Sequence, residues 1–563
     1  MKYKPLPVGY ENFREIIDKE CYFVDKTFFI KELIDKKLKV NLFTRPRRFG
    51  KTLMLSLLKY FFWDAYGYTG EKEDYRYLFE GLKIMDAGEE YTRHMGQYPV
   101  ISLTLKSGKQ STFEGSMDLL CTTIGYEFDN HRYVLDSERL TDAEKERFCN
   151  FLNKKCDLYE YKNSLNFLCK CLKKVFSKNV IVLLDEYDVP LEGAYHYGFY
   201  DEMVDFIREL FGSTLKTNDA LEFAVITGCL RISKESIFTG LNNLAINSIL
   251  GTNYGEYFGF TDDEVKAMCA DYGLSHKYEE LKSWYNGYYF GDVNVYNPWS
   301  TILYMYDHVS NEDYFPVSYW ANTSSNSIVR DLIDRADREV KDELEHLIAG
   351  GSIEKPVHED ITYDEIYDSM DNLWNFMFFT GYFKKVSERF EGRTRYVTMD
   401  IPNQEVLYIF ENKVRGWFDK KLKERNADRL FEALTSKNAD VLADEIAKML
   451  RISISYYDYK ENFYHGFMTG VLYGMEDYVV KSNRESGNGR TDIFLKPVSR
   501  RMTAYIFEFK CADSLEALED KAREALAQIN EKHYEEELIS DSYKIIVKYG
   551  VAFYKKDCFV VVE

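Results

Sequence analysis

The chain has 563 residues, a length that allows three or four domains, and 45 % of its residues are hydrophobic, which is ample for folded cores. Its formal net charge of −20 argues against a protein that coats nucleic acid over its whole surface. Its ten cysteines include no Cys-x-x-Cys pair, and it has neither a signal peptide nor an apolar run of 18 residues, so we expect a cytoplasmic protein with reduced thiols, no structural zinc site and no membrane span.

The first candidate site is a loop between a predicted strand at residues 39–44 and an apolar helix that begins at Leu53. The loop reads Arg-Pro-Arg-Arg-Phe-Gly-Lys-Thr over residues 45–52, and Gly-Lys-Thr between a strand and a helix is the centre of a P-loop. In such a loop backbone N–H groups hold phosphates, the lysine reaches the β- and γ-phosphates, and the hydroxyl binds Mg²⁺. The full pattern has a glycine where Arg45 stands, and the three arginines suit either polyphosphate or nucleic acid. We expect nucleotide contacts from five loop residues: Arg48, Phe49, Gly50, Lys51 and Thr52.

Two further predicted strands end in polar residues that would complete a nucleotide site. The apolar run at residues 180–184 is typical of a strand buried in a parallel sheet, and Asp185 and Glu186 follow it directly. Asp185 would complete the Mg²⁺ shell, and Glu186 would position or deprotonate the attacking water. A third apolar run, at residues 223–226, ends in Thr227, which would sense phosphate at the carboxyl edge of the sheet. The alternative is an α/β domain whose strands end in ordinary polar caps.

Residues 1–260 are therefore expected to form an α/β P-loop ATPase domain. Residues 261–335 are predicted to be a helical subdomain, opened by a capping box at Thr261-Asp-Asp-Glu264, whose many aromatic residues we expect to pack together rather than to stack on bases. Residues 336–450 have the pattern of a winged helix, and their acidic surroundings favour a scaffold role over DNA binding. The expected elements of this region are a helix near residues 364–378 and strands at 382–386 and 396–399.

The last part, residues 451–563, carries the second candidate site on two predicted strands. Asp492 lies in the first strand, and the second contains Glu508-Phe509-Lys510. Because side chains alternate along a strand, Glu508 and Lys510 share a face. Two carboxylates suit Mg²⁺, with the backbone carbonyl of Phe509 as a further ligand, and Lys510 would orient the attacking hydroxide. The alternative is an ordinary salt bridge on a solvated strand.

Three neighbouring features extend this site. Glu461 lies in the apolar stripe of a helix predicted at residues 456–475, and a carboxylate on a buried face needs a partner or a metal. Gln528 lies on a downstream helix that ends near Tyr534. Between residues 481 and 501 six basic residues meet only two acidic ones, which predicts an edge that contacts phosphates, with a solvated loop as the alternative.

Together these residues resemble one bacterial family, the predicted AAA-type ATPases that combine this form of P-loop with a C-terminal domain of the PD-(D/E)XK nuclease superfamily. The segments that carry the resemblance are residues 24–27, 45–52, 185–190, 236–244 and 483–492. The proline of the superfamily motif is replaced here by Thr491. The resemblance implies an α/β fold class: a P-loop ATPase domain, a helical and winged-helix-like middle, and a C-terminal restriction-endonuclease-like α/β domain.

The combined interpretation is a nucleotide-regulated, Mg²⁺-dependent nuclease that couples an ATPase module to phosphodiester hydrolysis. Five residues are predicted to be catalytic: Glu186, Glu461, Asp492, Glu508 and Lys510. Mg²⁺, or Mn²⁺ in its place, would be held by two pairs of residues, Thr52 with Asp185 and Asp492 with Glu508.

The expected partners are ATP and nucleic acid, with DNA favoured over RNA by analogy with the superfamily, and a homo-oligomer is left open. No membrane partner is expected. Two alternatives remain. One is a signalling or scaffold ATPase whose nuclease-like domain binds nucleic acid or protein without cutting. The other is a nuclease whose P-loop binds nucleotide only as a structural ligand.

Overall fold

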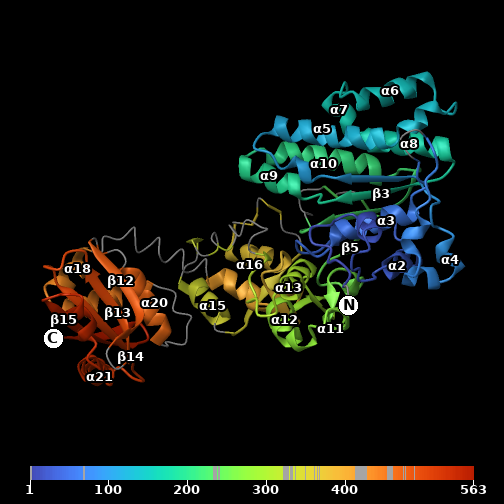
Figure 1. Cartoon of the computed structure of the whole chain (residues 1–563). Coiled ribbons are helices and arrows are strands. Elements are labelled where there is room, and N and C mark those ends of the chain that lie inside the picture. Colours follow the sequence, from blue (N-terminus) through green and yellow to red (C-terminus); the bar gives the residue numbers. More distant parts are fainter. Residues whose placement is uncertain are drawn as a thin grey trace. The chain divides into compact units, whose positions relative to one another are not determined.

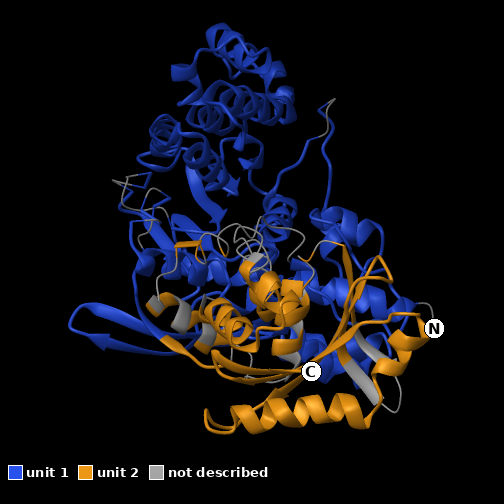
Figure 2. Cartoon of the chain, turned by 90° about the vertical axis from the view of Figure 1, so that its left-hand side faces the viewer, with its two compact units in different colours: residues 1–325, 354–406 blue, residues 326–353, 407–563 orange. Residues whose placement is uncertain are grey.

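Figure 1 shows the chain as a computed structural model, which describes residues 3–66, 70–231, 237–238, 241–320, 329, 332, 334–335, 338–348, 350–359, 362–363, 365–366, 368–411, 428–452, 461–472, 475, 477–486 and 489–563. The chain forms two compact units, coloured separately in Figure 2. The first consists of residues 1–325 and 354–406, and the second of residues 326–353 and 407–563.

The first unit is built on a five-stranded parallel sheet in the order β2-β3-β4-β1-β5. Its strands are β1 (Val40–Thr44), β2 (Val100–Thr104), β3 (Val180–Asp185), β4 (Leu221–Gly228) and β5 (Leu244–Asn247). The apolar runs of β1 and β3 are buried at every position, as expected of strands with helices on both faces. Leu184 pairs with Ile226, and Ile226 with Leu42, so the predicted nucleotide residues follow strands that end at one common edge.

Helices cover both faces of this sheet. The helices of this part of the chain are α1 (Phe13–Asp18), α2 (Phe28–Lys36), α3 (Lys51–Phe62), α4 (Glu89–Thr92), α5 (Phe113–Asn130), α6 (Asp142–Leu152), α7 (Leu158–Tyr161), α8 (Ser164–Phe176), α9 (Val189–Tyr197) and α10 (Tyr200–Leu215). Of these, α6 packs against α5 and α8, and α7 packs against α8. Figure 1 shows α5, α8 and α10 on one side of the sheet and α2 and α3 on the other. The spacing of Leu165, Leu168 and Leu172 gives α8 one apolar face, which it buries near β3.

A helical subdomain follows within the same unit. It contains β6 (Phe260–Thr261), α11 (Asp262–Asp271), α12 (Tyr278–Tyr285), β7 (Tyr288–Phe290), β8 (Val293–Tyr296) and α13 (Pro298–Ser310), with the sheet order β6-β8-β7. The predicted capping box is confirmed, because Thr261 and Glu264 each accept the other's backbone N–H at the start of α11.

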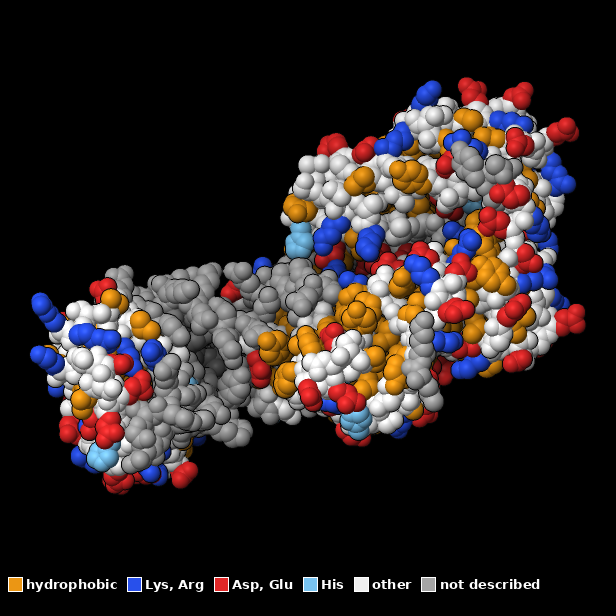
Figure 3. Space-filling model, in the orientation of Figure 1, with side chains coloured by type: hydrophobic (Ala, Val, Ile, Leu, Met, Phe, Trp, Pro, Cys, Tyr) orange, Lys and Arg blue, Asp and Glu red, His pale blue; other side chains and the backbone are white. Residues whose placement is uncertain are grey.

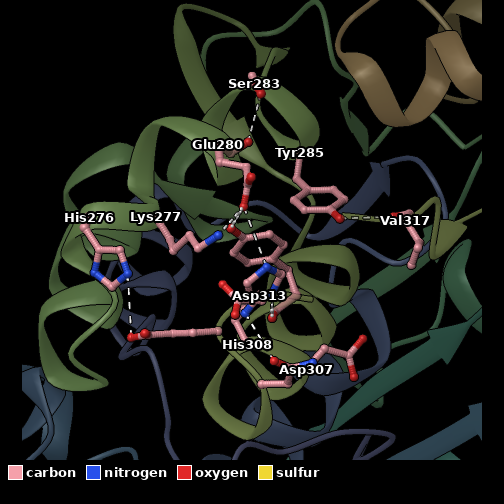
Figure 4. A network of polar contacts seen from close by, with 12 residues as sticks. His276, Lys277, Glu280, Ser283, Tyr285, Asp307, His308, Asp313 and Val317 are labelled. Atoms are coloured by element: carbon pink, nitrogen blue, oxygen red, sulfur yellow. Dashed lines mark hydrogen bonds and ion pairs between the residues drawn. The ribbon is translucent and has the colours of Figure 1, made fainter. Parts of the chain in front are cut away.

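The aromatic residues of this subdomain form its core, as expected. Tyr285, Tyr296 and Tyr304 are completely buried. Figure 4 shows the polar groups beside them, centred on Glu280. Its carboxylate accepts a hydrogen bond from the Tyr304 hydroxyl at 2.6 Å and lies 3.6 Å from Nε2 of His308. The tyrosines are thus used for packing and for internal hydrogen bonds.

The remaining part of the first unit contains the expected helix and strand pair. Its elements are β9 (Ile353–Val357), α16 (Met370–Phe379), β10 (Lys384–Glu391) and β11 (Thr394–Asp400), with the sheet order β10-β11-β9. The helix α16 begins later than residue 364 because Ser369 caps it, its Oγ accepting the Asn372 N–H at 3.1 Å. The turn between β10 and β11 contains Gly392, with a φ of +61°.

The second unit is a mixed sheet in the order β12-β13-β14-β15-β16, in which β14 and β15 pair in parallel and the other pairs are antiparallel. Its strands are β12 (Tyr478–Ser486), β13 (Gly489–Pro497), β14 (Ala504–Cys511), β15 (Ile546–Tyr554) and β16 (Asp557–Val562). Its helices are α15 (Arg338–Ile348), α18 (Asp428–Thr435), α19 (Ala439–Ile452), α20 (Glu461–Leu472), α21 (Leu518–Glu531) and α22 (Glu535–Ser540).

The sheet of the second unit is covered on both faces. Apolar residues of α18, α19 and α20 pack on one face, and those of α21 and α22 pack on the other. Both units are therefore α/β, which confirms the predicted fold class. No helix in the described part of the chain is both long and apolar enough to cross a lipid bilayer.

Gly228, the last residue of β4, is predicted to tolerate no side chain. A Cβ atom there would lie 2.5 Å from Cε1 of Tyr187 and 2.9 Å from Oδ1 of Asp188, and both neighbours are buried. We therefore expect Gly228→Ala to lower the free energy of unfolding by about 1–3 kcal/mol through overpacking. The matched control is Gly212→Ala inside α10, where a Cβ would meet no atom within 4 Å, so stability should rise by about 0.5–1 kcal/mol. Urea unfolding measures the stability of both variants. A Gly228→Ala protein as stable as the Gly212→Ala protein would contradict the close packing at β4.

Glu405 is predicted to make the stability of the first unit depend on pH. It is completely buried, and its carboxyl oxygens accept hydrogen bonds from Ser300 Oγ and the Trp320 N–H, each at 2.9 Å. Burial raises the pKa of Glu405 to about 7 from its ordinary value of 4.5. The folded state therefore binds this proton more tightly than the unfolded state, and stability should fall as the pH rises from 4.5 to about 7. Glu405→Gln should flatten this slope in unfolding measurements at several pH values, and an unchanged slope would assign it to other groups.

Candidate functional site

The first candidate site begins where the chain leaves β1 and enters α3. Arg48 (φ +71°) and Gly50 (φ +76°) both adopt the left-handed backbone conformation, which turns the loop toward the helix. Lys51 is buried at the first position of α3, and its ammonium donates to the carbonyl oxygens of Arg45 and Pro46, at 2.9 Å each. The loop thus closes around the lysine, beside the N-terminus of a 12-residue helix.

Asp185, at the end of β3, joins three elements of this site. Its carboxylate accepts hydrogen bonds from Thr52 Oγ1 at 2.7 Å and from Thr227 Oγ1. Thr52 lies in the first turn of α3, and Thr227 lies near the end of β4, the strand between β1 and β3. The structure therefore brings these three predicted residues together at the carboxyl edge of the sheet, where ligands of such folds bind.

Glu186 has a left-handed backbone (φ +52°), and its N–H donates to Thr227 Oγ1 at 3.4 Å. Burial and the adjacent Asp185 carboxylate raise the pKa of Glu186, while the charge of Lys51 opposes that shift. A carboxyl group with a raised pKa beside a nucleotide site is suited to proton transfer nearer to neutral pH.

Arg48 and Phe49 use their side chains for packing. The Arg48 guanidinium lies 4.4 Å from the ring centre of Trp299. The Phe49 ring packs edge-on against Tyr288 and Phe290, at 5.0 and 5.1 Å between ring centres. Because Phe49 is 1 % exposed, its backbone N–H rather than its ring is what it can offer to a phosphate.

Arg45, which stands at the glycine position of the P-loop pattern, has a structural role that sequence reasoning missed. Its completely buried guanidinium donates to the carbonyl oxygens of Thr44 at 2.9 Å and Asn247 at 2.6 Å. It also lies 5.2 Å from the ring centre of Phe258 and 4.8 Å from that of Phe290. Burial lowers the pKa of Arg45 to about 9. The only sign of this structural role in the sequence was that Arg45 stands where the P-loop motif has a glycine.

The P-loop also contacts the part of the same unit that contains α16, β10 and β11. A Cβ atom on Gly381, just after α16, would lie 3.0 Å from Cβ of Pro46, so the two segments are in close contact. Arg231, three residues beyond β4, lies 3.8 Å from Glu359, which in turn lies 3.8 Å from Arg395 on β11. Two links therefore join the carboxyl edge of the sheet to α16 and β11.

The second candidate site lies on β13 and β14. Asp492 Oδ2 accepts a hydrogen bond from the Phe509 N–H at 2.8 Å, so this carboxylate lies beside the Glu508–Lys510 segment. Glu508 is 3 % exposed, and its Oε1 lies 4.0 Å from the Lys510 ammonium. The structure brings these three predicted residues together.

Two residues from α21 and the segment after it, Gln528 and Tyr534, lie beside the carboxylate of Glu508. Gln528, on α21, donates hydrogen bonds to Glu508 Oε1 and, at 3.3 Å, to the Tyr534 hydroxyl. Burial raises the pKa of Tyr534, and the carboxylates of Glu508 and Asp492 act in the same direction. The buried carboxylate of Glu508 is therefore oriented by α21 from the opposite side of the sheet to α20.

The helix α20 supplies a residue that sequence reasoning did not assign to the site. That residue is His465. The predicted site residue of this helix, Glu461, is its first residue, and the Glu461 side chain lies outside the described residues. Nε2 of His465 donates a hydrogen bond to the backbone carbonyl of Asp492 at 2.9 Å. Its place one turn after Glu461 was the only signal that could have identified it.

Asp492 and Glu508 fit a Mg²⁺ site of the kind that uses one or two protein carboxylates together with water and substrate phosphates. The carbonyl of Phe509 is a further hard oxygen donor on the residue that fixes Asp492. Among the residues that the structure describes, no three His, Cys, Asp or Glu side chains are grouped to hold a metal ion. The donors of the site are oxygen atoms, which suit a Mg²⁺ ion whose coordination water and substrate complete.

The basic run between residues 481 and 501 contributes less charge than its sequence suggests. Lys496 is 4 % exposed, and its ammonium lies 2.5 Å from Glu537 and 2.9 Å from Asp541, so it is neutralised inside the domain. Two other basic side chains of the run lie outside the described residues: Arg484 and Arg490. On the face drawn in Figure 3, basic and acidic side chains are interspersed.

Two family models match the chain, one toward each end. Residues 7–238 match the family described as predicted AAA-ATPase, and residues 459–563 match the PD-(D/E)XK nuclease superfamily. A protein of Azotobacter chroococcum mcd 1, described as an uncharacterized protein in the vnfD 5′ region, is 27 % identical over 558 residues, which cover 95 % of this chain and 93 % of that protein. These two matches, a predicted AAA-ATPase toward the N-terminus and the PD-(D/E)XK nuclease superfamily at the C-terminus, agree with the architecture that the motifs predict.

Proposed function

We propose that this protein is a nucleotide-regulated, metal-dependent nuclease. The observation that carries the proposal is the convergence of Asp492, Glu508 and Lys510 in a nuclease-superfamily domain of a chain that also has an AAA-ATPase-like domain. In this proposal residues 1–260 bind nucleotide and residues 451–563 cleave the substrate. Residues 261–335 and 336–450 transmit the nucleotide-bound state from the first region to the last.

At the nucleotide site, Lys51 would exchange its two carbonyl partners for the β- and γ-phosphates of ATP. Thr52 and Asp185 would hold Mg²⁺, and the existing hydrogen bond between them already orients both groups. Glu186 would accept a proton from the attacking water, a role that its raised pKa supports. Backbone N–H groups of the loop would hold the remaining phosphate oxygens.

At the second site, Asp492, Glu508 and the Phe509 carbonyl would hold Mg²⁺, which when bound polarises the phosphodiester and makes water more acidic. Lys510 would orient the attacking water and stabilise it as it loses its proton. Gln528 would keep Glu508 in place through the hydrogen bond to Oε1. Water attacks phosphorus, one ester P–O bond breaks, and the departing oxygen takes up a proton.

Nucleic acid is the proposed substrate, with DNA favoured over RNA by analogy with the superfamily. The net charge of −20 and the interspersed surface charges support contact confined to the site rather than broad electrostatic binding. ATP is the proposed regulatory ligand.

The contacts inside the first unit support coupling between nucleotide and the winged-helix-like part. A phosphate that moved the P-loop would disturb the packing of Pro46 on Gly381, next to α16. A phosphate that attracted Arg231 would weaken its ion pair with Glu359, which also pairs with Arg395 on β11. Either movement changes the first unit outside the ATPase domain.

A second candidate function is a signalling or scaffold ATPase whose nuclease-like domain binds nucleic acid or protein without cutting. One observation favours it: both carboxylates already accept hydrogen bonds from within the domain, Asp492 from the Phe509 N–H and Glu508 from the Gln528 amide. Measuring ATP turnover with and without DNA, together with cleavage, separates the two functions because only the nuclease couples them.

Lys51→Ala should abolish measurable ATP·Mg²⁺ binding, since each lost charged hydrogen bond removes about 1.5–3 kcal/mol. Asp185→Ala should weaken binding, and Glu186→Gln should keep binding but lose hydrolysis. Lys59→Ala is the charge-matched control, because Lys59 lies two turns further along α3. Calorimetry measures the affinity and phosphate release measures turnover. Equal affinity of wild type and Lys51→Ala would refute the P-loop assignment.

Asp492→Ala and Glu508→Ala should each eliminate cleavage, because each removes a metal ligand. Lys510→Ala should keep the metal but slow the chemistry by about 10²-fold, the usual effect of losing a positioned proton-transfer group. Asp520→Ala, an exposed carboxylate in the first turn of α21, is the control. Chelation should abolish activity, and Ca²⁺ should support binding with little cutting.

The assay for these variants uses linear, circular and single-stranded DNA and RNA, with Mg²⁺ or Mn²⁺, in the presence and absence of ATP. If both carboxylate variants cut at the wild-type rate, the assigned site is wrong. If the wild-type protein cuts nothing under any of these conditions, the scaffold function becomes the better proposal.

A further inference from the structure

His465 lies where α20 meets the two strands of the candidate metal site. Its Nε2 lies 2.9 Å from the carbonyl oxygen of Asp492, and because a carbonyl can only accept, Nε2 carries the proton. Its ring packs edge-on against Phe509, at 6.1 Å between ring centres. Phe509 in turn donates its backbone N–H to Asp492 Oδ2. Three residues from a helix and two strands thus form a closed set of contacts.

These contacts lie on the β14 side of Asp492, where the strand pairing changes. The strands β13 and β14 pair from Ile493 to Leu495. Asp492, which precedes Ile493 in the chain, is the first residue beyond this pairing. Asp492 therefore lies where the paired ladder between these strands has stopped. The ladder between β12 and β13 continues on both sides of Asp492, and two further contacts hold this residue: the Phe509 N–H binds its carboxylate and His465 binds its carbonyl oxygen.

We infer that His465 is a positioning residue that holds Asp492 in the orientation needed to bind a metal ion. The inference rests on the proposed metal site and adds to it a residue that neither touches substrate nor transfers a proton. Outer-shell hydrogen bonds of this kind fix the direction of a ligand, and removing them typically weakens metal affinity or activity by about 10–100-fold.

The chain offers a matched control for the hydrogen bond itself. The Tyr543 hydroxyl donates to the carbonyl oxygen of Pro497 at 2.9 Å, which is also a side-chain contact to the main chain of β13, but at the other end of the strand. Tyr543→Phe removes that bond and keeps the ring. A purely structural role of His465 predicts the same consequences for both residues.

The test compares three full-length variants with the wild type. His465→Phe keeps a ring against Phe509 and removes the donor, whereas His465→Gln keeps a donor and removes the ring. The measurements are Mn²⁺ affinity by calorimetry, the Mg²⁺ concentration for half-maximal cleavage, and the unfolding temperature. We expect His465→Phe to weaken Mn²⁺ affinity and to raise the required Mg²⁺ by about 10–100-fold. His465→Gln should recover most of this loss, and Tyr543→Phe should leave both metal measurements unchanged.

The outcomes separate this inference from the proposed function. Wild-type metal affinity in His465→Phe overturns the positioning role, and so does an equal loss in His465→Gln or in Tyr543→Phe. If His465→Phe does not fold, His465→Ala replaces it with the same expected loss. A wild-type protein that binds Mn²⁺ but cuts nothing overturns the nuclease and still lets the affinities decide the role of His465. A wild-type protein that binds no Mn²⁺ overturns both.

Discussion

The carboxylate of Asp185 is the group on which the carboxyl edge of the parallel sheet in the first unit depends. It accepts hydrogen bonds from Thr52 on α3 and Thr227 on β4, and it ends β3 itself. A carboxylate that is 6 % exposed needs such partners, because removing a charge from water without them is very unfavourable. One group therefore sets the position of the P-loop helix relative to two strands.

The second unit also orients its site carboxylates through hydrogen bonds, but the donors differ. Asp492 is fixed by a backbone N–H from the neighbouring strand and Glu508 by the amide of Gln528, so each carboxylate is oriented before any ligand arrives. In the first unit the donors are hydroxyl groups, and in the second they are amides. In both units the donors come from elements that are distant in the sequence, and the acids cannot be oriented until the sheet has formed.

The parts of this structure that could be predicted from sequence depend on short-range periodicity. The Gly-Lys-Thr loop, the apolar runs that end in Asp185 and Thr227, and the shared face of Glu508 and Lys510 follow from residues a few positions apart. The strand β5 was not predicted, because a run of four residues, three of them partly exposed, has no strong pattern and its pairing with β1 is tertiary.

Side-chain roles at the two sites were harder to predict, for the same physical reason. The ring of Phe49 is buried by Tyr288 and Phe290, more than 200 positions away in the chain, so its predicted nucleotide contact depends on its backbone N–H. Lys496 appeared to belong to a basic edge, but it is paired with Glu537 and Asp541 on another element. A motif fixes the backbone of a site, whereas long-range packing decides what each side chain does.

The packing of Arg48 on Trp299 also gives the protein an intrinsic optical signal at its P-loop. The guanidinium lies 4.4 Å from the indole ring centre, and indole emission is sensitive to a charge held over the ring. Any ligand that withdraws Arg48 from this stack changes the surroundings of the chromophore. The arrival of such a ligand could therefore be followed in real time through tryptophan emission, in unlabelled protein and without waiting for a product to form.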